Sequence, residues 1–277
     1  VPYFQKLFEL IKTDTSDIFV VKKGAQVGAT TFFTALMVYY LCQFRQPVLY
    51  IAPRLLDAKR IFSQISQFLK VTGGKVLSRA DDYLLTTVGP VYAAAGTTPE
   101  SFRGKPAAFI FIDELAAFPS NIGGEGDLIS LSIARKSTFG KIGKIFAFST
   151  PTFNNTELER LFERATRQYV YLLKCERCDY LYPPALNLLC ECDKITCPRC
   201  LYENDRFESV KNGEWQLKVV NETEKDLIIS AFTLPQYVST LVKSENIVKF
   251  KNLANTRESR RAFSNLVEAE SVEPEMS

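Results

Sequence analysis

The sequence contains no histidine among its 277 residues. This absence excludes Ser-His-Asp and Cys-His nucleophilic catalysis, imidazole general bases and every metal site that needs an imidazole ligand. Any catalysis must therefore depend on carboxylates, lysines, arginines, hydroxyl groups or a bound metal.

Long hydrophobic runs are also lacking. The longest candidate, residues 32–42, is interrupted by Thr34 and falls short of the roughly 20 apolar residues of a membrane span, so we expect a buried helix and no membrane partner. The chain shows neither a signal-peptide pattern nor an initiator methionine, and we expect it to be a piece of a longer protein. Without a secretion signal, its seven cysteines indicate a reducing compartment and thiols used for metal binding or structure.

No large excess of charge of one sign is present. The 34 Lys and Arg and 31 Asp and Glu residues leave a net charge of +3. Residues 1–150 carry 17 basic and 11 acidic side chains, a net +6, whereas residues 151–277 carry 17 and 20, a net −3. This balance does not identify a nucleic-acid binder by itself. The 46% hydrophobic and 23% charged residues are typical of a globular protein and exclude a disordered one.

Short apolar runs alternate with longer amphipathic stretches from residue 17 to about residue 150. Continuous apolar runs such as residues 109–112 are typical of strands buried on both faces, and they predict an α/β sheet covered by helices. The expected strands are 18–21, 48–51, 91–94, 109–112 and 144–148, and the expected helices are 30–44 and 55–69. A cysteine-rich stretch at 175–200 follows, then a strand at 227–232, polar helices and an acidic linker at 268–277.

Residues 18–31 contain a buried strand, a loop with two glycines and the start of a helix. A phosphate-binding loop requires this order, because main-chain N–H groups and the helix N-terminus then point at the anion. The common pattern G-x-x-x-x-G-K-[ST] is not matched, since its lysine has moved to the start of the loop; Lys22 is an alternative to Lys23. A βα turn that binds nothing is the other interpretation. The candidate nucleotide-binding residues are Lys23, Gly24, Ala25, Gln26, Val27, Gly28, Ala29 and Thr30.

A fully apolar strand ends in two adjacent carboxylates, Asp113 and Glu114. Residues at the carboxyl end of a strand fall where open α/β sheets bind ligands. Asp113 is a candidate to hold Mg²⁺ together with Thr30, and Glu114 a candidate to orient and deprotonate the attacking water of an ATPase. The alternative is a strand followed by a charged turn.

The expected strand at 144–148 ends in Ser149, Thr150 and a proline. Small hydroxyls at this position are candidates to sense the γ-phosphate from a neighbouring strand. Ser-Thr-Pro is also an ordinary strand exit, and both interpretations stay open.

Two C-x-x-C pairs are separated by 18 residues, the spacing of a four-thiolate zinc ribbon. Cys190 and Cys192 lie between the pairs, but a one-residue gap forms a poorer knuckle. Four thiolates leave no open position for water, so we expect a structural zinc rather than a catalytic one. The alternative is a set of unligated buried thiols. The predicted ligands are Cys175, Cys178, Cys197 and Cys200.

The three ATPase elements, in this order, resemble the ATPase part of phage terminase large subunits, in particular the lambda-type family. Residues 23–30 match its displaced-lysine pattern K-x-A-x-V-G-x-[ST], and Asp113-Glu114 and Ser149-Thr150 resemble its catalytic and coupling motifs. Arg103 resembles an arginine finger that acts on a neighbouring subunit, with a surface arginine as the alternative. Gln5 lies in a segment similar to the adenine-recognition segment, although an extra aromatic residue separates its Tyr and Gln.

The resemblance implies a P-loop NTPase of the additional-strand, catalytic-glutamate type. Its mostly parallel sheet would be covered by helices, with a small cysteine-rich, zinc-ribbon-like insertion and a helical C-terminal segment. ATP, Mg²⁺ and structural Zn²⁺ are the expected cofactors. The implied partners are double-stranded DNA, the portal protein of the procapsid, the small terminase subunit and copies of this chain in a ring on the portal, with a monomer in isolation. The implied location is the host cytoplasm, transiently at the portal vertex.

The predicted function is a motor that couples Mg-ATP hydrolysis to translocation of double-stranded DNA into a procapsid. We expect an ATPase core at 1–172, a zinc-binding subdomain at 173–215, and a strand and helices at 216–277 that complete the ATPase region before a linker. Nothing after residue 200 shows the acidic pattern of a two-metal nuclease, so nuclease activity is not expected. The alternatives are a helicase-like translocase, which would need a second nucleotide fold, and a non-hydrolysing zinc-ribbon DNA-binding scaffold.

Overall fold

The computed structural model describes residues 1–221 and 227–274, and the chain divides into two compact units. Unit 1 contains Val1–Thr15, Val21–Gly28 and Thr150–Ser277, and unit 2 contains Ser16–Val20 and Ala29–Ser149. The helices of the described residues are all too short or too polar to cross a membrane.

The strands of unit 2 form a mostly parallel sheet in the order β1-β7-β6-β2-β5-β4-β3. The central strand β6 (Phe109–Asp113) pairs in parallel with β7 (Lys144–Ser149) and with β2 (Val48–Ala52), which pairs in parallel with β5 (Gly89–Ala95). At one edge, β4 (Tyr83–Thr86) and β3 (Val76–Arg79) continue the sheet in antiparallel fashion. Of β1 (Ile18–Lys23), the first three residues belong to this unit. The sequence-based prediction of a mostly parallel α/β sheet is confirmed.

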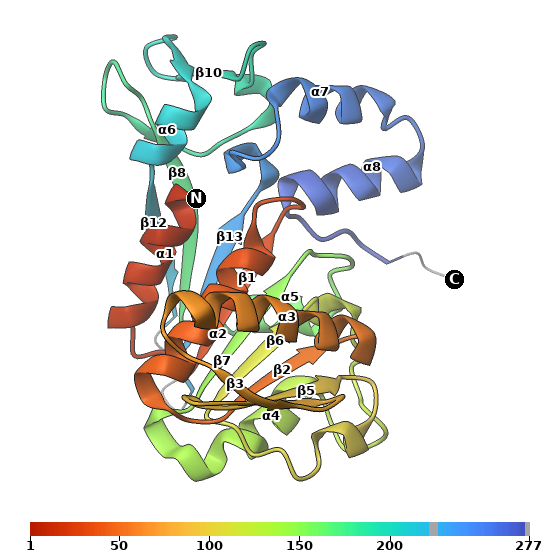
Figure 1. Cartoon of the computed structure of the whole chain (residues 1–277). Coiled ribbons are helices and arrows are strands. Elements are labelled where there is room, and N and C mark those ends of the chain that lie inside the picture. The colour runs from red at the N-terminus through yellow and green to blue at the C-terminus, as the bar shows by residue number, and fades with distance from the viewer. Residues whose placement is uncertain (222–226, 275–277) are drawn as a thin grey trace. The chain divides into compact units, whose positions relative to one another are not determined.

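Helices cover both faces of this sheet. Figure 1 shows α2 (Ala29–Phe44) and α3 (Leu55–Val71) on one face and α4 (Leu128–Lys136) on the other. The core between α2 and the sheet is aromatic: the ring centroids of Phe33 and Phe111 are 5.1 Å apart, and both side chains are buried. Burial on both faces explains why β2 and β6 are almost continuously apolar.

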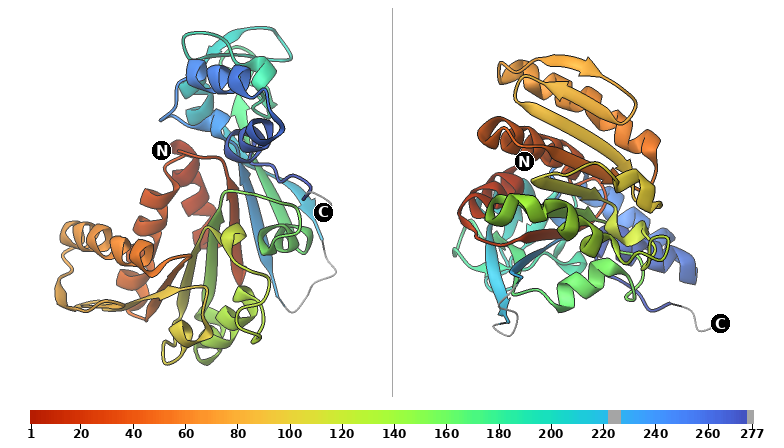
Figure 2. Two further views of the ribbon diagram at one scale, coloured as in Figure 1. Left: turned by 90° about the vertical axis from the view of Figure 1, so that its right-hand side faces the viewer. Right: turned by 90° about the horizontal axis from the view of Figure 1, so that it is seen from below.

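Unit 1 is built around β8 (Arg167–Lys174), which lies between β12 (Glu214–Val220) and β13 (Ile229–Leu234). β12 and the short β9 (Leu181–Tyr182) pair with β8 in antiparallel fashion, and β13 pairs in parallel. Helix α1 (Pro2–Thr13) packs against β12 and against α6 (Arg206–Asn212), while α5 (Glu157–Glu163) packs against β13. Figure 2 shows further views of these elements.

A cysteine-rich ribbon and two further helices complete unit 1. The ribbon contains the antiparallel pair β10 (Lys194–Thr196) and β11 (Glu203–Asp205). The helices α7 (Ser244–Leu253) and α8 (Arg257–Phe263) pack against each other around a small buried cluster that includes Ile247 and Phe263.

The elements expected from the sequence are found with small shifts of their ends. The strand expected at 227–232 begins and ends two residues later, as β13, which starts beside the first residues of β8. Helix α1 was not predicted, although its buried residues Tyr3, Phe4, Leu7 and Ile11 follow the period of a helix. The acidic segment expected at 268–277 lies partly outside the described residues, since these end at residue 274.

Candidate active site and thiol cluster

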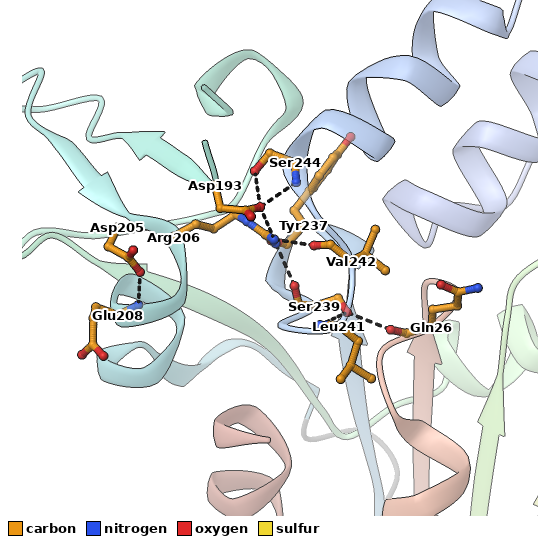
Figure 3. Close-up of polar contacts among 10 residues, drawn as sticks. All are labelled: Gln26, Asp193, Asp205, Arg206, Glu208, Tyr237, Ser239, Leu241, Val242 and Ser244. Atoms are coloured by element: carbon orange, nitrogen blue, oxygen red, sulfur yellow. Dashed lines mark hydrogen bonds and ion pairs between the residues drawn. The ribbon is translucent and has the colours of Figure 1, made fainter. Parts of the chain in front are cut away.

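The main chain of the loop after β1 is held by hydrogen bonds from several distant segments of unit 1 (Figure 3 shows one of them). The bonds are Gly24 N to Leu234 O (2.8 Å), Ala25 N to Leu266 O (2.6 Å), Gln236 Nε2 to Ala25 O (2.9 Å), Ser239 Oγ to Gln26 O (2.7 Å) and Tyr3 Oη to Val27 O (2.6 Å). The N–H groups of Gly24 and Ala25 therefore shape the loop itself. The first turn of α2, which follows in the chain, supplies N–H groups that have no intrahelical acceptor.

The two glycines of the loop have different geometric roles. A Cβ atom at Gly24 would lie 2.6 Å from Gln236 N and 2.8 Å from Leu266 O, so only glycine fits there. Gly28 has a φ of 81°, in the left-handed region that favours glycine. Gln26 also has a positive φ, 54°, which is uncommon for a residue with a side chain. The surrounding contacts, rather than the loop's own preferences, hold this conformation.

The two adjacent lysines at the end of β1 make different contacts, because successive residues of a strand point to opposite faces. Lys23 is 8% exposed, and its Nζ donates to Thr150 Oγ1 at 3.1 Å. Lys22 forms an ion pair with Glu159 at 3.1 Å and lies 4.5 Å from the centroid of the Phe162 ring. Lys22 is therefore engaged with α5, and Lys23 with the residue that follows β7.

Asp113 ends β6, and its Oδ2 accepts a hydrogen bond from the hydroxyl of Tyr50 at 2.8 Å. Tyr50 is buried on the neighbouring strand β2. Burial, and then the Asp113 carboxylate, raise the pKa of the Tyr50 hydroxyl, because an ionised tyrosine would be poorly solvated and would face a like charge. Tyr50 therefore stays protonated and orients the carboxylate of Asp113.

Glu114 follows Asp113 in the left-handed conformation, with φ 53° and ψ 52°. Its N–H donates to Phe148 O on β7 at 2.8 Å. The buried Ser149 accepts a hydrogen bond at its Oγ from Ala116 N at 3.0 Å, so the end of β7 holds the turn that carries Glu114. Such strained conformations persist where surrounding structure over-determines them and are common at active sites.

The remaining residues predicted for an ATPase site lie at the surface. Thr30 is exposed in the first turn of α2, where its carbonyl oxygen accepts from Thr34 Oγ1 at 2.9 Å. The exposed Arg103 forms a 2.8 Å ion pair with Glu125. Gln5 is exposed on α1.

Each unit holds part of the predicted set. Unit 1 contains the loop residues up to Gly28, and also Thr150, Gln5 and the cysteines, whereas unit 2 contains Ala29, Thr30, Arg103, Asp113, Glu114 and Ser149. Within unit 1 the structure brings Lys23 and Thr150 together. Within unit 2 it brings Ser149 to the turn after Glu114.

The four cysteines of the two C-x-x-C pairs converge in the ribbon, with all four Sγ atoms within 4.8 Å of one another. Sγ–Sγ distances are 3.7 Å between Cys175 and Cys200 and 3.8 Å between Cys178 and Cys197. A tetrahedral zinc with Zn–S bonds of about 2.3 Å needs Sγ–Sγ distances of about 3.8 Å. The thiol positions therefore fit a zinc ion.

Burial opposes ionisation of the Cys175 thiol, but the N–H groups of Cys178 and Arg177 lower its pKa to about 7. At Cys178 the N–H of Tyr180 favours the thiolate, yet burial and the neighbouring thiols raise the pKa to about 12. Four thiols in one site do not all ionise without a cation, because thiolates repel each other. Cys190 lies apart from the cluster, with its Sγ 3.1 Å from Thr196 Oγ1.

Sequence reasoning missed the residues that hold the loop and the carboxylate: Tyr3, Tyr50, Gln236 and Ser239. Three of them come from segments far from the loop in sequence, so no motif spacing indicates them. Tyr50 was accessible in principle, because it lies in an expected strand, and pairing of that strand with 109–112 would place it near Asp113.

The sequence matches the family model of the phage terminase large subunit gpA, ATPase domain, over residues 1–215. A search of curated proteins gave no match.

Several solved structures share the fold. The HK97 bacteriophage large terminase has a TM-score of 0.59 at 11% identity over 97% of this chain, which spans 50% of that protein. The ATPase domain of the Thermus phage P74-26 large terminase has a TM-score of 0.58 at 15% identity, covering 95% of this chain and 92% of that one. The large terminase of another thermophilic bacteriophage, in complex with ADP, has a TM-score of 0.57 at 13% identity, covering 93% of this chain and 48% of that one.

The family match covers most of the chain and all the ATPase motifs, and the structural matches show the same fold. The chain belongs to the family of phage terminase large subunit gpA ATPase domains.

Proposed function

We propose that this chain is the motor part of a lambda-type terminase, which hydrolyses Mg-ATP and translocates double-stranded DNA into an empty procapsid. Family membership supports the ATPase activity and the packaging role. The displaced-lysine pattern at residues 23–30 supports the lambda type.

The observation that carries the proposal is the phosphate loop with its buried lysine. Its main chain is fixed from several segments, and Lys23 lies at its base against Thr150. In this proposal Lys23 and the main chain from Gln26 to Thr30 hold the phosphates, while Gly24 and Ala25 set the shape of the loop. Lys22 stabilises the fold through Glu159 instead.

Thr30 and Asp113 would hold Mg²⁺, since a hydroxyl and a carboxylate are oxygen ligands that this ion prefers. When bound, Mg²⁺ neutralises charge on the phosphates. Glu114 takes the proton of the attacking water, Ser149 and Thr150 couple phosphate loss to movement, and Gln5 contacts the adenine.

Cys175, Cys178, Cys197 and Cys200 would hold a structural zinc, which supplies crosslinks to a ribbon with few apolar residues of its own. Their Sγ–Sγ distances support this metal. Residues 173–215 would then form the zinc-binding subdomain between an ATPase core at 1–172 and a completing segment at 216–277.

The motor would act as a ring of copies on the portal protein in the host cytoplasm, with double-stranded DNA and the small terminase subunit as further partners. In isolation the chain would be a monomer. Arg103 would then complete the site of a neighbouring copy, after leaving its exposed ion pair with Glu125.

ATP affinity of two single variants tests the phosphate loop. Lys23→Ala should weaken ATP binding about 10- to 100-fold, the range expected for a lost hydrogen bond to a charged group. Lys22→Ala is the matched control: it should lower the melting temperature by leaving Glu159 without its ion pair, and change ATP affinity less than about 3-fold. Isothermal titration calorimetry measures both. Equal ATP affinities for the two variants would contradict the proposal.

A further inference from the structure

The buried guanidinium of Arg206 joins segments of unit 1 that are far apart in the sequence (Figure 3). Arg206 begins α6, and its side chain is 0% exposed. Its Nη1 donates to Tyr237 O at 3.0 Å and to Ser239 O at 2.8 Å. Its Nη2 donates to Asp193 Oδ1 at 3.0 Å and to Val242 O. The two terminal nitrogens therefore bind one carboxylate and three carbonyl groups.

Asp193 and Arg206 close the base of the hairpin formed by β10 and β11. Arg206 N donates to Asp193 O at 2.9 Å, next to the antiparallel pairing of the two strands. The turn at the other end of this hairpin contains Cys197 and Cys200, half of the thiol cluster. The geometry of the Asp193–Arg206 pair therefore depends on the fold of the hairpin that the cysteines hold.

Asp193 also fixes the start of α7. Its Oδ1 accepts from Ser244 N at 2.7 Å and from Ser244 Oγ at 3.1 Å. Burial favours the neutral acid, but the bonds from Ser244 and Arg206 outweigh it and hold the pKa of Asp193 below its usual value. Arg206 and Asp193 thus form an ion pair with additional hydrogen bonds, the arrangement that a buried charge requires.

The segment that Arg206 binds also holds the phosphate loop. Ser239 accepts from Arg206 at its carbonyl oxygen, and its hydroxyl donates to Gln26 O at 2.7 Å. Gln236, at the start of the same segment, donates to Ala25 O at 2.9 Å. In Figure 3, Ser239 lies between Arg206 and Gln26. One residue therefore connects the guanidinium with the loop residue whose φ is 54°.

Only arginine fits this position. Buried carbonyl groups need donors, and an apolar side chain at 206 would leave three of them and Asp193 without one. A lysine ammonium keeps the charge but lacks the planar fork with two donor nitrogens.

We propose that Arg206 is a positioning residue for the phosphate loop: through Ser239 it sets the main chain at Gln26, and through Asp193 it makes that setting depend on the cysteine ribbon. The affinity for nucleotide should then depend on the metal state of the thiol cluster. This inference rests on the proposed roles of the loop in ATP binding and of the four cysteines in zinc binding.

The test is the ATP dissociation constant of the full chain, measured by calorimetry before and after removal of metal with a chelator, with metal content checked by elemental analysis. Arg206→Lys and Ser239→Ala should each weaken ATP binding about 5- to 20-fold, within the usual range of coupling between sites. Lys211→Met, which removes an exposed cation from the same helix, is the control and should change affinity less than 2-fold.

Removal of metal should weaken ATP binding by the wild-type chain about 5- to 20-fold, and by the Ser239→Ala variant less than 2-fold, because that variant has already lost the connection. A purely structural role of Arg206 would leave the metal response of Ser239→Ala as large as that of the wild type, and this result would overturn the inference. ATP binding by Ser239→Ala equal to that of the wild type would overturn it as well. Absence of ATP binding by the wild-type chain would instead overturn the proposed function, and the inference with it.

Discussion

At the scale of single residues, the candidate catalytic carboxylates are held by groups that no motif contains. The hydroxyl of Tyr50 donates to Asp113, and the main chain of Glu114 is tied to β7 in a left-handed conformation. A ligand carboxylate that accepts such a bond has a fixed orientation, and loss of an outer-shell partner of this kind commonly weakens metal binding 10- to 100-fold.

Tyr50→Phe removes only the hydroxyl that donates to Asp113. We expect the Mg²⁺ concentration needed for half-maximal ATP turnover to rise about 10-fold, at the lower end of the range for outer-shell partners. Thermal unfolding should show a loss of about 1 kcal/mol of stability from the missing hydrogen bond. Tyr92→Phe, which removes a hydroxyl from the neighbouring strand β5, is the control. The same Mg²⁺ requirement in both variants would show that Tyr50 does not orient Asp113.

The sequence alone left Lys22 and Lys23 as alternatives, because a one-residue difference does not show which side chain faces the loop. The structure separates them through strand alternation, with Lys22 on Glu159 and Lys23 on Thr150. Motif spacing locates a phosphate loop, whereas the groups that hold its main chain, such as Ser239, follow from tertiary contacts between distant segments.

At the scale of elements, the buried strands were predictable because a strand covered on both faces is almost continuously apolar, as in β2 and β6. The edge strands were not. All four residues of β3 are exposed, and β12 is mostly exposed, so neither has the apolar run that marks a central strand. Their positions depend on pairing with β4 and β8, which are distant properties of the fold.

The cysteine ribbon gives an elemental prediction. We expect about one zinc per chain in protein purified without a chelator, because the four thiols have the distances of a tetrahedral site. Cys175→Ser and Cys200→Ser should lose the zinc. Cys190→Ser should keep it, because Cys190 faces Thr196 outside the cluster. Zinc-free wild-type protein, or zinc lost only on Cys190→Ser, would refute the site.

At the scale of the whole molecule, the two units exchange chain at functional motifs. The chain passes between them from Gly28 to Ala29, inside the candidate phosphate loop, and from Ser149 to Thr150, inside the candidate coupling motif. Ser149 bonds to the turn after Glu114 in unit 2, and Thr150 bonds to Lys23 in unit 1. Two neighbouring residues therefore belong to the two halves of the proposed ATPase machinery, which supports their proposed coupling role.

The central claim, that Glu114 activates water in an ATP-hydrolysing motor, is tested most directly by the turnover of Glu114→Gln, measured with DNA and portal-bearing procapsids present. Glu163→Gln, which neutralises an exposed carboxylate of α5, is the control and should keep wild-type turnover. Glu114→Gln should bind ATP with near wild-type affinity and lose at least about 100-fold in turnover, the contribution expected of a general base. Undiminished turnover in Glu114→Gln, with ATP binding intact, would contradict the account.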